Sequence, residues 1–126
     1  MSATLYSANG TQREIKPANG KYFTLEELCA QLHCQYIEVI NCGDPAMIMI
    51  GDEESRLHDD FVINVEATRI CREGLGVPTT PEGARAYFKQ VIEQYGDSAI
   101  ICFDPEVEEP YTVAGDVIYC PSIMLK

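Results

Sequence analysis

The order of apolar and polar positions between residues 20 and 73 predicts a helix, two strands and a second, short helix with little intervening loop. Thr24 and Glu27 have the spacing of a capping box, in which each side chain bonds the main-chain amide of the other residue. The apolar residues that follow recur at helical spacing. We therefore expect a helix that begins at Thr24 and ends near His33 or Cys34. Its apolar face carries Leu25, Leu28, Cys29 and Leu32.

Two strands and a short helix follow. In the segment QYIEVINC, Tyr36, Glu38 and Ile40 face one way and Ile37 and Val39 the other, as in a half-buried strand. The segment AMIMIG is apolar on both faces, so we expect it in the middle of a sheet. Asn64 precedes VEATRIC as an N-cap, which predicts a helix of about two turns. Its apolar side carries Val65, Thr68, Ile70 and Cys71.

Further elements lie on either side of this region. The N-terminal segment resembles two short strands joined at Asn9-Gly10, a dipeptide that favours a tight hairpin turn. Residues 79–96 carry the strongest helix pattern, with Thr80 as cap, Pro81 at the first helical position and Gly96 after the end. SAIICF and VAGDVIYC predict two more strands, and the apolar part of PSIMLK predicts a C-terminal segment that docks on the body.

These elements predict one α+β domain over residues 1–126, with a largely antiparallel sheet of about five to six strands. Two main helices and one short helix accompany the sheet. The 126 residues are 46% hydrophobic, which suits one compact core. The chain opens without a signal sequence, and no stretch approaches the roughly 20 apolar residues that span a bilayer. We therefore expect a cytoplasmic protein that does not contact a membrane.

Acidic residues outnumber basic ones 20 to 9, for a formal net charge of −11. No Lys or Arg lies between Lys21 and Arg56, or between Lys89 and Lys126. Such a field repels phosphate backbones and disfavours direct nucleic-acid binding. The charge can serve solubility, form an acidic face for a basic partner, or imitate the phosphates of DNA. The candidate acidic surface comprises Asp52, Glu53, Glu54, Asp104, Glu106, Glu108 and Glu109.

Cysteine and histidine provide the candidates for chemistry. Most of the six cysteines lie in apolar runs, so we expect most to be reduced, buried and inert. Cys29, His33 and Cys34 are the best metal candidates, because residues four apart share a helix face. A closed zinc site needs four ligands and the chain has no CxxC, so we expect no metal and no cofactor. His33 and His58 are the available bases for a cysteine nucleophile, but neither lies in a nucleophile-turn sequence, and we assign no catalytic residue.

The order of YFTLEELCAQLHCQYIEVI, AMIMIGDEESRL, DFVINVEATRI and AGDVIYC resembles the family called domain of unknown function 3846. These are small proteins carried by phages and conjugative elements of gut bacteria. The match covers residues 22–70 and 114–120, and the helix at 81–95 is additional to the family core. His33, Cys34 and Gln35 stand where the family commonly has a glycine pair. The resemblance implies a mobile-element origin and an α+β fold, and it implies no activity or catalytic residue.

Charge and resemblance together predict a small accessory protein of a mobile genetic element that binds a basic protein partner through its acidic surface. An alternative is a protein that binds or sequesters a small nucleotide-like ligand, stacked on aromatic side chains. The aromatic candidates are Tyr87, Phe88, Tyr95 and Tyr111, although their helical spacing is also typical of core residues. A cysteine-dependent enzyme is a further alternative.

Overall fold

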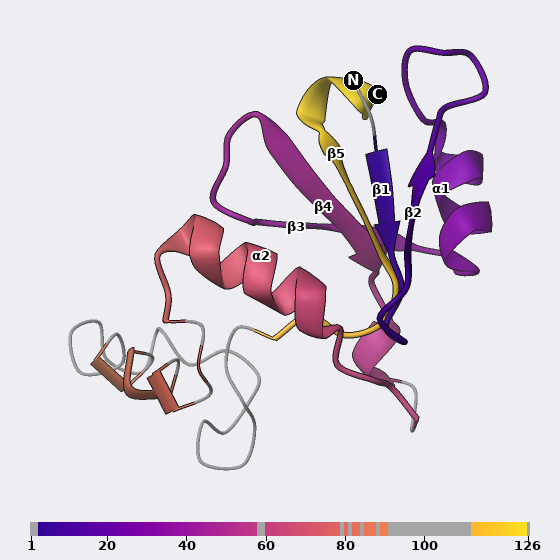
Figure 1. The fold of residues 1–126 in the computed structure, drawn as a ribbon. Coiled ribbons are helices and arrows are strands. Elements are labelled where there is room, and N and C mark those ends of the chain that lie inside the picture. The colour runs from indigo at the N-terminus through magenta and orange to yellow at the C-terminus, as the bar shows by residue number, and fades with distance from the viewer. Residues whose placement is uncertain are drawn as a thin grey trace.

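A computed structural model describes residues 3–57, 60–78, 80, 82–83, 85–87, 89–90 and 112–125. In these ranges five strands form one sheet in the order β2-β1-β5-β4-β3, and each neighbouring pair is antiparallel (Figure 1). The strands are β1 (Ala3–Tyr6), β2 (Gln12–Ile15), β3 (Ile37–Ile40), β4 (Met47–Asp52) and β5 (Val117–Pro121). The helices are α1 (Leu25–Leu32) and α2 (Val65–Leu75), with the 3-10 helices η1 (Ser55–Leu57) and η3 (Ser122–Met124). The predicted α+β fold with an antiparallel sheet is confirmed.

The C-terminal strand β5 lies between β1 and β4, so the two ends of the chain pair in the middle of the sheet (Figure 1). Ile118 stands opposite Leu5 on one side and Ile50 on the other. Strand β4 has a neighbour on each side, as its apolar sequence predicts. Successive residues of β4 enter different cores, Ile50 on one face of the sheet and Met49 on the other.

Each face of the sheet carries its own core and its own helix. Leu28 and Leu32 of α1 pack on one face, and Ala67 and Cys71 of α2 pack on the other. The α1 core comprises Ala3, Leu5, Ile15, Phe23, Leu28, Leu32, Ile50, Ile118, Cys120 and Met124. The α2 core comprises Cys42, Met49, Ala67, Cys71, Val113 and Val117. Because strand residues alternate between the faces, one apolar strand can supply both cores.

Helix α1 begins and ends as its sequence predicts. The Thr24 hydroxyl accepts from the Glu27 amide at 3.2 Å, and the Glu27 carboxylate accepts from the Thr24 amide at 3.1 Å. The helix ends at His33, whose φ of 54° and ψ of 47° are left-handed. Leu25 was predicted on the packed face of the helix, but its side chain is 60% exposed. Leu25 and Phe23 instead line an open groove at the rim of the core.

Helix α2 begins at the predicted cap, where Asn64 Oδ1 accepts from the Ala67 amide at 3.1 Å. It continues to Leu75 and ends at Gly76, whose φ is 74°, so the prediction of about two turns was too short. The polar residues after Cys71 concealed this continuation, because they break the apolar pattern. Val65 was wrongly placed on the packed side: it lies two residues before Ala67, on the opposite side of the helix, and is 78% exposed.

The C-terminal segment docks on the α1 core, as predicted. Met124 is buried, and its carbonyl accepts from the Phe23 amide at 2.7 Å, whereas Ile123 is exposed. The predicted strand SAIICF lies outside the described residues. Of the helix predicted over 79–96, residues 82–83, 85–87 and 89–90 are described and are helical. No helix in the described ranges is long and apolar enough to cross a membrane.

Candidate functional site

Three of the seven predicted acidic-surface residues lie in the described chain: Asp52 ends β4, and Glu53 and Glu54 lie in the turn after it. The Glu54 amide donates to Asp52 Oδ1 at 2.9 Å, and the Glu53 amide donates to the Tyr36 carbonyl at 3.1 Å. Because Asp52 pairs with Ile37, this turn lies beside the start of β3. The other four, Asp104, Glu106, Glu108 and Glu109, lie outside the described residues, so their place on the surface stays a prediction.

A fourth carboxylate, which the sequence did not assign to this surface, lies next to the turn. Glu38 on β3 stands opposite Gly51, one residue from Asp52 along β4. Burial raises the pKa of the Glu38 carboxyl, the neighbouring charges of Glu53 and Asp52 raise it further, and Arg56 opposes them. We call Glu38, Asp52, Glu53 and Glu54 the acidic corner. Its membership depends on the register of β3 against β4, which spacing along the chain does not reveal.

The acidic corner lies on the outermost strand of the sheet. In the described part of the chain β3 pairs with β4 alone. The flanking side chains Tyr36 and Val39 are 57% and 54% exposed. An edge strand presents main-chain N–H and C=O groups that can pair with another chain. The corner therefore combines clustered carboxylates, exposed apolar side chains and a strand edge that no other described strand pairs with.

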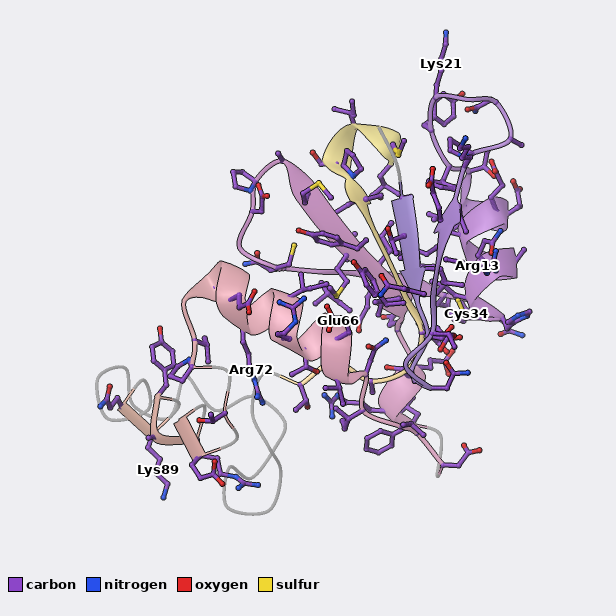
Figure 2. The ribbon with its side chains drawn as sticks, viewed as in Figure 1. Arg13, Lys21, Cys34, Glu66, Arg72 and Lys89 are labelled. Atoms are coloured by element: carbon purple, nitrogen blue, oxygen red, sulfur yellow. The ribbon has the colours of Figure 1, made fainter. Side chains whose placement is uncertain are left out.

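The structure also brings two of the three predicted metal candidates, His33 and Cys34, next to the predicted acidic surface. His33, Cys34 and Gln35 line a cavity of about 250 Å³ together with Asp52 and Glu54. Cys34 lies on the α1 side of the sheet, away from Glu66 on α2 (Figure 2). No group of three or more His, Cys, Asp and Glu side chains within the described residues could hold a metal ion.

The cysteines divide into buried and partly exposed groups. Cys42, Cys71 and Cys120 are buried free thiols, as predicted for most cysteines, whereas Cys29 and Cys34 are partly exposed. Burial, followed by the nearby Cys29 and Asp52, raises the pKa of the Cys34 thiol to about 11. A catalytic nucleophile needs the opposite shift, so His33 and Cys34 do not form an activated pair. Cys102 and His58 lie outside the described residues.

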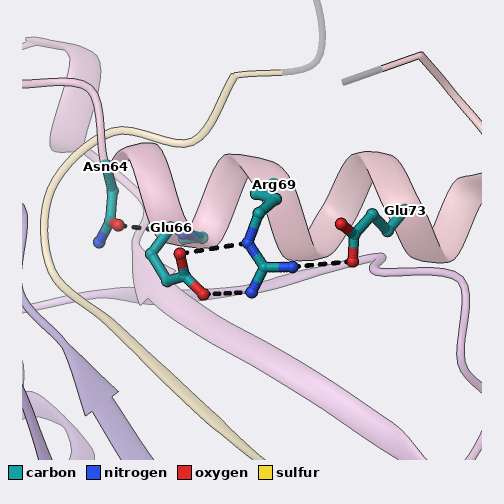
Figure 3. A network of polar contacts seen from close by, with 5 residues as sticks. Asn64, Glu66, Arg69 and Glu73 are labelled. Atoms are coloured by element: carbon teal, nitrogen blue, oxygen red, sulfur yellow. Dashed lines mark hydrogen bonds and ion pairs between the residues drawn. The ribbon is translucent and has the colours of Figure 1, made fainter. Parts of the chain in front are cut away.

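A second cavity, of about 450 Å³, lies between α2 and the sheet. Arg69 lines it and is held by two carboxylates of its own helix: Nη1 donates to Glu73 at 2.8 Å, and Nε donates to Glu66 at 3.2 Å (Figure 3). The aromatic lining consists of Tyr6 and Tyr119, which the sequence did not suggest. Of the aromatic residues that it did suggest, Tyr87 is described and partly buried, and the others lie outside the described residues.

Comparison of the chain with models of known families, with curated proteins and with solved structures found no match. The resemblance to the family of domain of unknown function 3846 therefore stays a prediction. The geometry and charge of the described residues are the basis for a proposal about function.

Proposed function

We propose that this protein binds a basic segment of a partner protein at the acidic corner, with β3 as the strand on which that segment docks. The observation that carries the proposal is the presence of four carboxylates at one end of an edge hairpin. Charge by itself is also compatible with solubility alone. Its coincidence with an open strand edge and with the exposed Tyr36 and Val39 favours binding.

Electrostatics within the corner favour a cationic ligand. The pKa of Glu38 is raised by burial and then by the charge of Glu53, so ionised Glu38 is penalised in the free protein. Arg56 reduces this penalty, but its guanidinium also donates to the carbonyl and hydroxyl of Thr112 and lies 5.8 Å from the centre of the Phe61 ring. A Lys or Arg side chain from a partner offsets the remaining repulsion.

Strand pairing gives the proposed interaction its geometry. A partner segment in extended conformation can bond to the outer main-chain groups of β3, while its side chains alternate between the two faces of the sheet. One face carries Glu38 and the other carries Val39. Asp52 pairs with Ile37 and therefore lies on the Val39 face. A segment with alternating basic and apolar residues can place its basic side chains on the Glu38 face and its apolar side chains beside Val39.

The biological setting that we propose rests on the sequence resemblance alone. An accessory protein of a phage or conjugative element would meet proteins of its host and of its own element. Either kind could supply the basic segment, in a cytoplasmic setting.

Binding of a capped peptide of alternating Lys and Val residues, followed by fluorescence anisotropy, tests the proposal. The double variant Glu38→Gln/Glu53→Gln should weaken binding of the peptide by about threefold to tenfold, because each of the two substitutions removes a partly screened charge contact. The matched control Glu14→Gln/Glu26→Gln removes the same charge at exposed positions on β2 and α1 and should change affinity by less than about twofold. An equal loss of peptide affinity in the two double variants, or no binding of the peptide by the wild type, would overturn the proposal.

A small-ligand function is the second candidate, supported by the cavity of about 450 Å³ lined by Tyr6, Tyr119 and Arg69. The rings suit stacking and the guanidinium suits an anionic group, although Asp44 and Glu73 also line the cavity. A nucleotide panel in thermal unfolding separates the two functions. A melting temperature raised by one nucleotide, and no longer raised in Arg69→Gln, supports the second candidate. An unchanged melting temperature with every nucleotide removes it.

A further inference from the structure

Helix α1 ends in a turn that joins two cysteines. His33 adopts the left-handed conformation, and the Cys34 amide donates to the Cys29 carbonyl at 3.1 Å. This bond, from the second residue after the helix back to the third residue before its end, is the mark of a Schellman motif. In this motif the side chains of the two bonded positions commonly touch. Here both positions are cysteine.

The two thiols belong to the same tight turn. Cys29 Sγ donates to the carbonyl of Gln35, the residue after Cys34, at 3.6 Å. Burial, followed by the nearby Cys29, raises the pKa of Cys34. Both side chains are partly exposed, in contrast to the buried Cys42, Cys71 and Cys120. The main-chain bond between the two residues brings their Cα atoms together, as a disulfide requires.

We propose that Cys29 and Cys34 form a reversible dithiol site that reduces low-molecular-weight disulfides, cationic ones in preference, and closes an intramolecular disulfide across the end of α1. One protein thiol loses its proton and attacks a sulfur of the external disulfide, which releases one small thiol and leaves a mixed disulfide. The second protein thiol loses its proton and attacks the protein sulfur of that mixed disulfide, which releases the other small thiol. In sum, two protein thiols are oxidised to one disulfide and one external disulfide is reduced to two thiols.

The surroundings of the pair set its preference for the oxidant. His33 and Cys29 face Cys34 from the end of α1, and Asp52 and Glu54 face the same cavity from β4 and the turn after it. The two carboxylates attract a cationic disulfide and repel an anionic one. Because the pKa of Cys34 is raised to about 11, the thiolate population and the reaction rate should both increase as the pH rises from 7 to 9.

The test uses the reduced full-length protein and two probes, cystamine as the cationic disulfide and glutathione disulfide as the anionic one. After acid quenching, a glutamyl endopeptidase that cleaves after Glu27 and Glu38 releases residues 28–38, which contain Cys29 and Cys34 and no other cysteine. We expect this peptide to lose two hydrogens without retaining a small thiol. Cystamine should react at least about threefold faster than glutathione disulfide at low salt, and this difference should shrink at high salt.

Two further measurements keep the proposal falsifiable. Cys29→Ser and Cys34→Ser should each retain one small thiol on the remaining cysteine, because the second displacement is blocked. Ring closure from the mixed disulfide should be about tenfold faster in the folded protein than in urea, because the turn holds the thiols together. Equal closure rates, a wild-type peptide that keeps two small thiols, or an unreacted peptide would each overturn the proposal.

Discussion

Replacing Asn64 with Asp isolates what the amide nitrogen of Asn64 contributes to the fold. Asn64 is 1% exposed. Its Oδ1 accepts from the Ala67 amide, and its Nδ2 donates to the carbonyls of Tyr6 at 3.0 Å and Gly115 at 2.9 Å. Aspartate has the same shape and keeps the acceptor, so the cap of α2 is retained. It cannot make the two donated bonds, which connect α2 to the end of β1 and to the segment before β5.

The size of the expected loss in stability follows from these two hydrogen bonds. Each lost hydrogen bond is worth about 1 kcal/mol, and a carbonyl left unpaired away from water adds about 1–3 kcal/mol. Some of that cost is recovered by local relaxation, so we expect Asn64→Asp to lower the free energy of unfolding by about 3–5 kcal/mol at pH 7. That loss is a large part of the stability of a domain of this size.

The loss should depend on pH in a defined direction. Burial and the two carbonyl oxygens raise the pKa of the introduced carboxyl in the folded state above its unfolded value of about 3.9. The folded variant therefore holds its proton more tightly than the unfolded chain, and its stability falls as the pH rises between the two values. At pH 4.5, inside that window, the folded carboxyl is mostly protonated and donates one bond, so the loss relative to wild type should be about 2 kcal/mol smaller at pH 4.5 than at pH 7.

Urea unfolding followed by far-UV circular dichroism at the two pH values measures this effect. Asn9→Asp is the matched control, because Asn9 is exposed and acts as an acceptor toward the amide and hydroxyl of Thr11. It adds the same charge and should change the unfolding free energy by less than about 0.5 kcal/mol. The reasoning is refuted if the two variants behave alike, or if the loss in Asn64→Asp is independent of pH.

Three further substitutions test local features of the fold. Gly74→Ala should destabilise by about 1–3 kcal/mol in urea unfolding, although helices favour Ala, because its Cβ would lie 1.7 Å from the Cys42 carbonyl oxygen; a gain in stability would contradict this close approach. Thr24→Ala should cost about 1 kcal/mol in the same assay through loss of the α1 cap, and an unchanged midpoint would count against the cap. Hydrogen bonds from the Ala18 and Thr24 amides lower the pKa of Glu27. The ionised Glu27 carboxylate therefore stabilises the fold above the pKa of the unfolded chain, and this stabilisation is lost as the pH falls. Glu27→Gln should show a smaller change in urea midpoint between pH 7 and pH 3 than wild type, and an equal change would refute this.

Elements fixed by neighbouring residues could be predicted from the sequence. The capping box at Thr24 and Glu27, the end of α1 at His33 and the cap at Asn64 each depend on residues a few positions apart. The interior position of β4, with a neighbour on each side, was also predictable, because a strand that is apolar on both faces must be covered on both.

Features that depend on strand order and register could not be predicted in this way. The insertion of β5 between β1 and β4 places the Tyr6 and Gly115 carbonyls beside Asn64, and spacing along the chain contains no trace of it. The same holds for Glu38, which joins the acidic corner through its pairing opposite Gly51. Arg72 on α2 is 2% exposed, contrary to the usual exposure of Arg, so a periodicity argument places it outside.

The most direct test of the acidic corner is a map of main-chain amide shifts as the alternating Lys-Val peptide is added to ¹⁵N-labelled protein. Docking on the β3 edge predicts that the largest changes fall at Tyr36 to Ile40 and Asp52 to Glu54, and that they weaken as ionic strength rises. Changes centred on α2, spread evenly over the acidic surface, or insensitive to salt would contradict the account.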